Sequence, residues 1–134
     1  MKKKALLILA LVVLLSLSIV AAATGIMGKK PFKDLDAAKI ESASVHLLPP
    51  DKTVQIEEIK ELIEYLEDVV VHGKDNSFSE YSGQACIFTI TKTDGTVMEV
   101  TAYNTFIVID GVGYKCKSEP CEALNIYANR LLND

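Results

Sequence analysis

The residues of this chain best suited to nucleophilic or metal chemistry are its three cysteines and two histidines. Cys116 and Cys121 lie five positions apart, which matches neither a redox C-x-x-C pair nor half of a zinc site. A local disulfide between them requires Cα atoms within about 7 Å of each other. The dipole of a helix beginning near Cys121 could instead activate that thiol as a nucleophile. Because free cysteine is among the most buried residue types, packing is the first interpretation for both, and for Cys86.

The histidines and carboxylates show no catalytic or metal-binding arrangement. His46 and His72 stand far apart, without H-x-x-x-H or H-x-H spacing, so we expect solvent-facing side chains. The acidic residues within 57–68 follow one helix face, whereas acid–base catalysis needs carboxyl groups held across a cleft. G-x-S-x-G, H-E-x-x-H, S-x-x-K and glycine-rich phosphate loops do not occur in the chain. The sequence therefore predicts no catalytic residue, no metal ligand and no cofactor.

Residues 40–70 change from the period of a strand to the period of a helix. In ESASVHLL the apolar residues alternate with polar ones, which predicts a half-buried strand that ends at Pro49-Pro50. A short extended TVQI follows. The stretch 57–70 then places Ile59, Leu62, Ile63, Leu66 and Val69 on one stripe, as expected for an amphipathic helix. Residues 70–72 continue as an extended segment, and the polar stretch 72–83 predicts a loop.

Two β-hairpins are predicted next. In the first, a three-residue loop with Gly95 left-handed pairs Lys92 with Thr96. This register gathers the core residues on one face, whereas a two-residue turn would mix core and solvent positions. The core set is Cys86, Phe88, Ile90, Met98, Val100 and Ala102. The second hairpin turns FIVI into VGYKC at Asp110-Gly111.

The chain is predicted to end in a helix that packs on the sheet. Ser118 suits the N-cap and Pro120 the first turn, while Cys121, Leu124, Ala128 and Leu131 form the inward stripe. The expected class is α+β: an antiparallel meander of four to five strands, one helix after the first strands and the C-terminal helix on the sheet.

A shallow binding groove is a hypothesis for the second hairpin. A glycine inside a strand leaves its neighbours uncovered or lets another backbone approach. Gly113 could therefore form the floor of a groove beside Tyr103, Phe106 and Val108, although a bulge or helix packing explains it equally well. Under the groove hypothesis, Gly113→Val should weaken ligand binding while sparing the fold.

The first 23 residues are typical of an export leader. Three lysines precede the apolar run 5–23, and the small residues Ala21 and Ala23 suit a signal peptidase site. Cleavage would release a secreted domain. Retention would give an anchor, because nineteen helical residues span about 28 Å, close to the thickness of the bilayer core. We expect residues 1–23 to be a signal peptide or N-terminal membrane anchor, 24–39 a tether and 40–134 a single domain.

The leader and the charge together limit where the domain acts and what it binds. The basic end of the leader stays in the cytoplasm, so the remainder is extracytoplasmic, either secreted or anchored by residues 5–23. Residues 24–134 carry eleven basic and eighteen acidic side chains, a net charge of −7. Such a charge disfavours nucleic acid and anionic headgroups. The expected partner is a protein, peptide or wall component at the cell surface, with membrane contact only through the N-terminal segment.

Several phrases of the exported part are similar to a known domain. EEIKELIEYL, YSGQACIFTITKTDGT and EPCEALNIYANRLLN resemble a domain of unknown function from Firmicutes, over about Phe32 to Leu132. Such domains stand behind signal peptides or anchors and are also appended to BlaR/MecR-type sensor metallopeptidases. The resemblance implies an extracytoplasmic module but no functional residue, since this chain has no H-E-x-x-H helix.

Composition, missing motifs and this resemblance favour an exported recognition module without catalytic activity at the cell envelope. An alternative is an inhibitor or regulator of an envelope peptidase or antibiotic-response sensor. A third hypothesis is an enzyme that uses Cys121 as its nucleophile.

Overall fold

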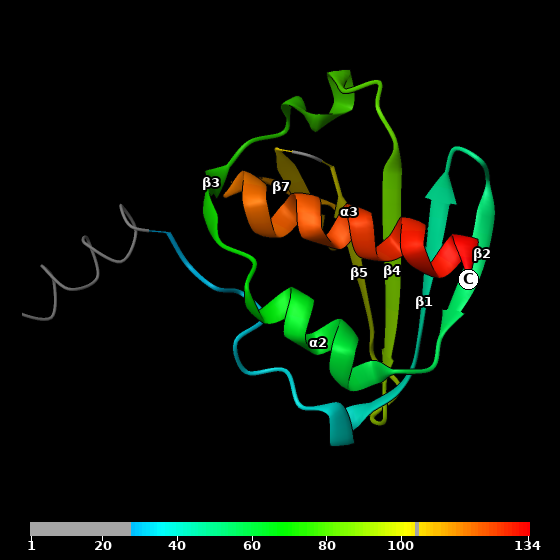
Figure 1. Ribbon diagram of the computed structural model, residues 1–134. Helices are drawn as coiled ribbons and strands as arrows, with labels where there is room; N and C mark the ends of the chain where they lie inside the picture. The colour runs from blue at the N-terminus through cyan, green and yellow to red at the C-terminus, as the bar shows by residue number, and fades with distance from the viewer. Residues whose placement is uncertain (1–27, 104) are drawn as a thin grey trace, which may run out of the picture.

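The computed structural model describes residues 28–103 and 105–134, so the predicted leader 1–23 lies outside the described residues. In this part of the chain, seven strands form one antiparallel sheet in the order β2-β1-β4-β5-β6-β7-β3, accompanied by two α-helices (Figure 1). The strands are β1 (Ile40–Leu48), β2 (Lys52–Ile56), β3 (Val71–Lys74), β4 (Ala85–Lys92), β5 (Val97–Ala102), β6 (Phe106–Ile109) and β7 (Val112–Cys116). The helices are α2 (Ile59–Glu67) and α3 (Ser118–Asn133), with 3-10 turns η1 (Ala37–Lys39) and η2 (Ser77–Glu80). The predicted α+β class is confirmed.

The sheet is larger than the four to five strands expected. The additional strands are its two edges: β2 pairs with β1, and β3 pairs with β7. Each edge strand buries a single side chain, Ile56 in β2 and Val71 in β3. Neither stretch therefore shows the repeated apolar alternation by which a strand is recognised in sequence. Between them, α2 carries the chain from one edge of the sheet to the other.

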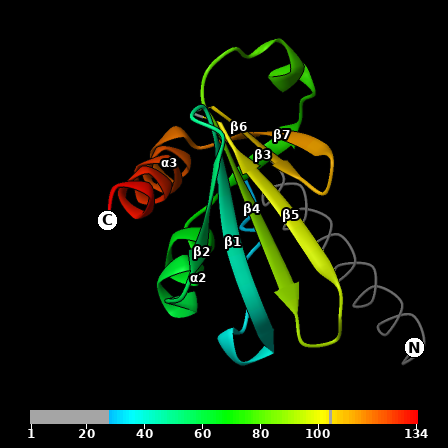
Figure 2. The ribbon, with the colours of Figure 1, turned by 90° about the vertical axis from the view of Figure 1, so that its right-hand side faces the viewer.

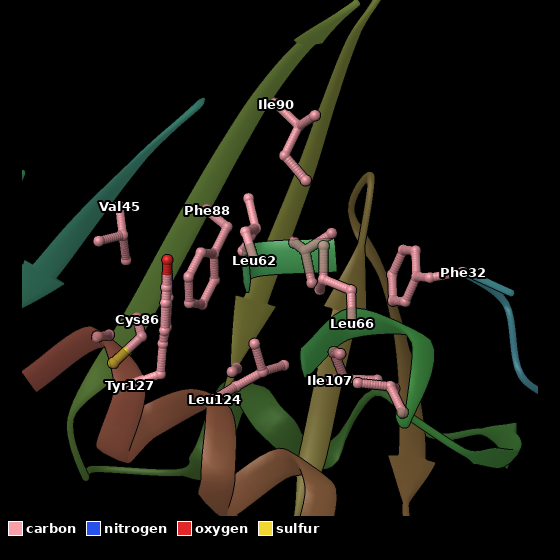
Figure 3. Close-up of a cluster of buried hydrophobic side chains, with 14 of the residues drawn as sticks. Phe32, Val45, Leu62, Leu66, Cys86, Phe88, Ile90, Ile107, Leu124 and Tyr127 are labelled. Carbon is pink, nitrogen blue, oxygen red and sulfur yellow. The ribbon is translucent and has the colours of Figure 1, made fainter. Parts of the chain in front are cut away.

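Both helices cover the same face of the sheet (Figure 2). The helical stripe predicted for α2 is confirmed, with Leu62, Ile63 and Leu66 buried and Ile59 half-buried. Figure 3 shows Leu62 and Leu66 in one cluster with Phe88 of β4 and with Leu124 and Tyr127 of α3. Burial of such apolar area, at about 25 cal/mol per Å², is the main force that holds the helices on the sheet.

The predicted register of the first hairpin and the predicted turn of the second are confirmed. Phe88 pairs with Val100 and Ile90 with Met98. The Lys92 amide donates to the Thr96 carbonyl at 2.8 Å, and Gly95 has φ +89°. In the second hairpin, Ile109 pairs with Val112 across Asp110-Gly111, and both turn residues have positive φ, as a type I′ turn requires.

The start of α3 differs by one residue from the prediction. Lys117 is the N-cap, and Ser118 is the first helical residue. The Lys117 amide donates to the carbonyl of Val70 at 2.9 Å, which keeps Lys117 extended and places the helix start after it. Pro120 lies in the first turn, as predicted, and Cys121 is buried.

Residues 28–39, which were expected to be a tether, pack against the domain. Phe32 is only 2% exposed and belongs to the core cluster, where Figure 3 shows it beside Leu66 and Ile107. Lys29 forms an isolated antiparallel bridge with Val71 on the outer side of β3. Leu35 and Ala37 also pack against the core cluster. These few apolar side chains among charges give no regular periodicity, so the docking left little trace in the sequence.

Candidate functional site

A concave surface with four lysines lies where the N-terminal segment meets the β3 edge of the sheet. Its volume is about 740 Å³, within the range of small-molecule sites. The lining residues are Gly28, Lys29, Lys30, Pro31, Lys33, Val71, Lys74, Ile109 and Tyr114. We call it the lysine pocket. Its position at the edge of the sheet leaves it open to ligands from solvent.

Backbone pairing and one buried ring hold the N-terminal wall of the lysine pocket in place. The amides of Lys29 and Val71 each donate to the other's carbonyl at 2.8 Å. Phe32 enters the core, so the exposed Lys30 and Lys33 on either side of it face away from the core. The wall is therefore attached at two points rather than held only by chain connectivity.

The opposite wall comes from the sheet. Ile109 and Tyr114 are half-buried and present apolar surface beside exposed Lys74, and Val71, which is buried, also lines the pocket. Lys74 pairs with Tyr114 between β3 and β7, and β7 lies between β6 and β3 in the sheet. The result is an apolar floor with ammonium groups around it.

The charge of the lysine pocket is opposite to that of the domain. The lining of the lysine pocket contains four of the eleven basic residues of the described chain and none of its eighteen acidic residues. Ammonium groups on one concave surface attract anions, and the apolar floor favours a ligand with a nonpolar portion. The geometry suits recognition of an anionic ligand. The site was not predicted from the sequence, because three of its lysines lie in the expected tether and the fourth in an edge strand; the lysine-rich stretch GKKPFK was the available signal.

The predicted groove residues come together on the face of the sheet without helices, but the chain itself fills the space over Gly113. A Cβ on Gly113 would lie 2.4 Å from the Asp75 carbonyl oxygen and 2.5 Å from the Phe78 ring. The Asp75 amide donates to the Gly113 carbonyl at 2.9 Å. Gly113 therefore allows close approach of another backbone, and the expectation that Gly113→Val would spare the fold is wrong.

Aromatic side chains from the polar loop 72–83 cover the neighbouring groove residues. Tyr103 stacks with Phe78 at a ring-centroid distance of 6.2 Å and contacts Tyr81 edge-on at 5.2 Å. Val108 is 8% exposed and Phe106 half-buried. We interpret this cluster as packing of the loop onto the sheet.

The three cysteines converge beneath α3 as free, buried thiols. The Cys121 thiol donates to the carbonyl of Phe106 at 3.4 Å, and it also contacts the thiol of Cys116. The hydrogen bond between the two thiols raises the pKa of Cys121 and lowers the pKa of Cys116. Burial raises the pKa of Cys86 to about 11. A fully buried, protonated Cys121 is unsuited to nucleophilic attack. The Cys116–Cys121 disulfide stays a prediction, now with both thiols in contact.

His46 takes part in a short hydrogen-bonded series on the β1–β2 hairpin. Its Nδ1 lies 2.7 Å from Thr53 Oγ1, and its Nε2 lies 2.8 Å from Asp51 Oδ1. A carboxylate, an imidazole and a hydroxyl in series are the groups of an acid–base relay. However, Thr53 and Asp51 are exposed and lie on the hairpin itself. These contacts hold the β1–β2 hairpin together, and this structural role explains them without a catalytic one. Among residues 28–103 and 105–134, no group of three or more His, Cys, Asp or Glu residues could hold a metal ion.

Two further observations bear on the class of protein. Within the described ranges, neither helix combines the length and the apolar character needed to cross a bilayer, and the predicted leader lies outside those ranges. Comparison with protein-family models, curated proteins and solved structures gives no match. Fold and site thus define the class: an α+β domain with helices on one face of its sheet and a basic pocket at one edge.

Proposed function

We propose that this protein is an exported recognition module of the cell envelope, which binds an anionic partner at the lysine pocket and catalyses no reaction. The observation that carries the proposal is the set of Lys29, Lys30, Lys33 and Lys74 around an apolar floor in an otherwise acidic domain. The leader pattern of residues 1–23 supports export. The burial of Cys121 supports binding rather than covalent chemistry.

Local charge supports an anionic partner despite the net charge of −7. Exposed charges farther from a bound ligand than a Debye length, about 8 Å at physiological salt, are largely screened from it by the dissolved ions. A ligand seated in the pocket therefore responds chiefly to the nearby lysines. Binding should weaken as salt concentration rises, because exposed charges contribute most of the attraction.

A charge-matched pair of variants tests the proposal. The pocket variant carries K29Q, K30Q, K33Q and K74Q; the control carries K39Q, K52Q, K60Q and K92Q, which remove the same charge outside the pocket. Binding of oligoglutamate and hexametaphosphate to the full chain in neutral detergent is measured by calorimetry. We expect at least one anion to bind the wild type and the control, with about tenfold or greater weakening in the pocket variant. Equal loss in both variants, or no binding to the wild type, would contradict a specific pocket.

A further inference from the structure

We infer that the ligand of the lysine pocket is the headgroup of an anionic phospholipid in the membrane beside which the domain is held. This inference rests on the proposed function and names its ligand class. It differs from the expectation that the membrane is contacted only through the N-terminal segment, because that expectation used the net charge of the whole domain.

The position of the pocket along the chain places it near a bilayer. Gly28, which lines the pocket, is the fifth residue after Ala23, where the apolar run ends. Five residues span at most about 18 Å when fully extended. If the apolar run is retained in the bilayer, the pocket lies within reach of the headgroup layer, which is roughly 5–8 Å thick on each side.

The side chains of the pocket suit a phosphate group attached to an apolar body. Its four cations are all lysines, which act as compact point charges for phosphate, whereas the chain's arginine, Arg130, lies in α3. Val71, Ile109 and Tyr114 offer an apolar surface for the glycerol and the first methylene groups. A tyrosine with an apolar ring and a polar tip is typical of the membrane interface.

Attachment of the wall also favours a membrane ligand. The Lys29–Val71 bridge and buried Phe32 fix the segment that begins at Gly28 on the domain, so the pocket keeps its place on the part of the domain that directly follows the leader in the sequence. Clusters of lysine beside an apolar segment attract anionic lipid through charge, and each basic residue close to the surface strengthens that attraction.

The test is lysine acetylation of the wild-type full chain in lipid nanodiscs, with the rate at each lysine measured by mass spectrometry. One set of discs contains phosphatidylcholine alone, and the other contains added phosphatidylglycerol. We expect the four pocket lysines to react about fivefold more slowly in the phosphatidylglycerol discs. Lys52 in β2 and Lys60 in α2 serve as internal controls and should keep their rates.

Further arms of the experiment separate this inference from the proposed function. Oligoglutamate and hexametaphosphate are added to the phosphatidylcholine discs. If either anion protects the pocket lysines and phosphatidylglycerol does not, the lipid inference is overturned and the proposed recognition of an anion is retained. If phosphatidylglycerol, oligoglutamate and hexametaphosphate all fail to protect the pocket lysines, both the lipid inference and the proposed function are overturned. Equal slowing at Lys52 and Lys60, or equal protection in both kinds of disc, also overturns the lipid inference.

Discussion

At the scale of single residues, the sulfur and imidazole groups that first suggest chemistry serve packing and hydrogen bonding in the described structure. The thiols are buried, and His46 joins two strands through Thr53 and Asp51. Tyr127 stands out instead. Its ring stacks on Tyr65 at 4.6 Å, yet its hydroxyl is buried with no hydrogen-bond partner among the described residues. An unpaired buried hydroxyl costs free energy that a phenyl ring would not.

Tyr127→Phe should therefore stabilise the protein, by about 1 kcal/mol at neutral pH. Burial raises the pKa of Tyr127 to about 12 from 10.0. A raised pKa in the folded state gives stability that is complete below pH 10 and is lost as pH rises through 12. The variant should lack this alkaline loss. Denaturant unfolding from pH 7 to 11.5 measures both effects. A variant less stable than the wild type would show that the hydroxyl has a stabilising partner.

At the scale of elements, the loop between β3 and β4 is fixed by its contacts with β7. Asp75 and Phe78 occupy the space over Gly113, whereas a Cβ on Gly73 of the adjacent strand would meet nothing within 4 Å. The two glycines therefore form a matched pair on neighbouring strands, one packed and one open.

Gly113→Ala should lower the free energy of unfolding by about 1–3 kcal/mol, because its methyl group would collide with the Asp75 carbonyl and displace the loop. Gly73→Ala should change it by less than about 0.5 kcal/mol. Urea titrations of the two variants, compared with the wild type, give both values. Similar small costs would mean that the loop does not rest on Gly113.

At the scale of the whole molecule, the folded unit begins before the first long strand, and charge is distributed unevenly over it. Phe32 connects the N-terminal segment to the core, and the same segment supplies three of the four pocket lysines. Stability of the domain and integrity of the lysine pocket should therefore depend on one side chain.

Phe32→Ala should cost about 3–5 kcal/mol, the usual range for losing a buried phenyl ring. It should also release the pocket wall, so that trypsin cleaves after Lys29 and Lys33 faster than after Lys60 under native conditions. Thermal unfolding and timed proteolysis with mass spectrometry measure these outcomes. If residues 28–36 behaved as a free tether, stability would not change and cleavage at Lys29 and Lys33 would already be fast in the wild type.

The sequence alone determined the elements with strong periodicity or defined turn chemistry. The α2 stripe, the Gly95 bulge and the Asp110-Gly111 turn follow from local spacing and backbone preference, which act within a few residues. Only the tertiary structure decided that β2 and β3 complete the sheet, that Phe32 docks, and that Asp75 and Phe78 close over Gly113. These contacts join residues far apart in the chain, so no local pattern encodes them. The lysine pocket belongs with them, because packing brought Lys74 beside a segment some forty residues earlier.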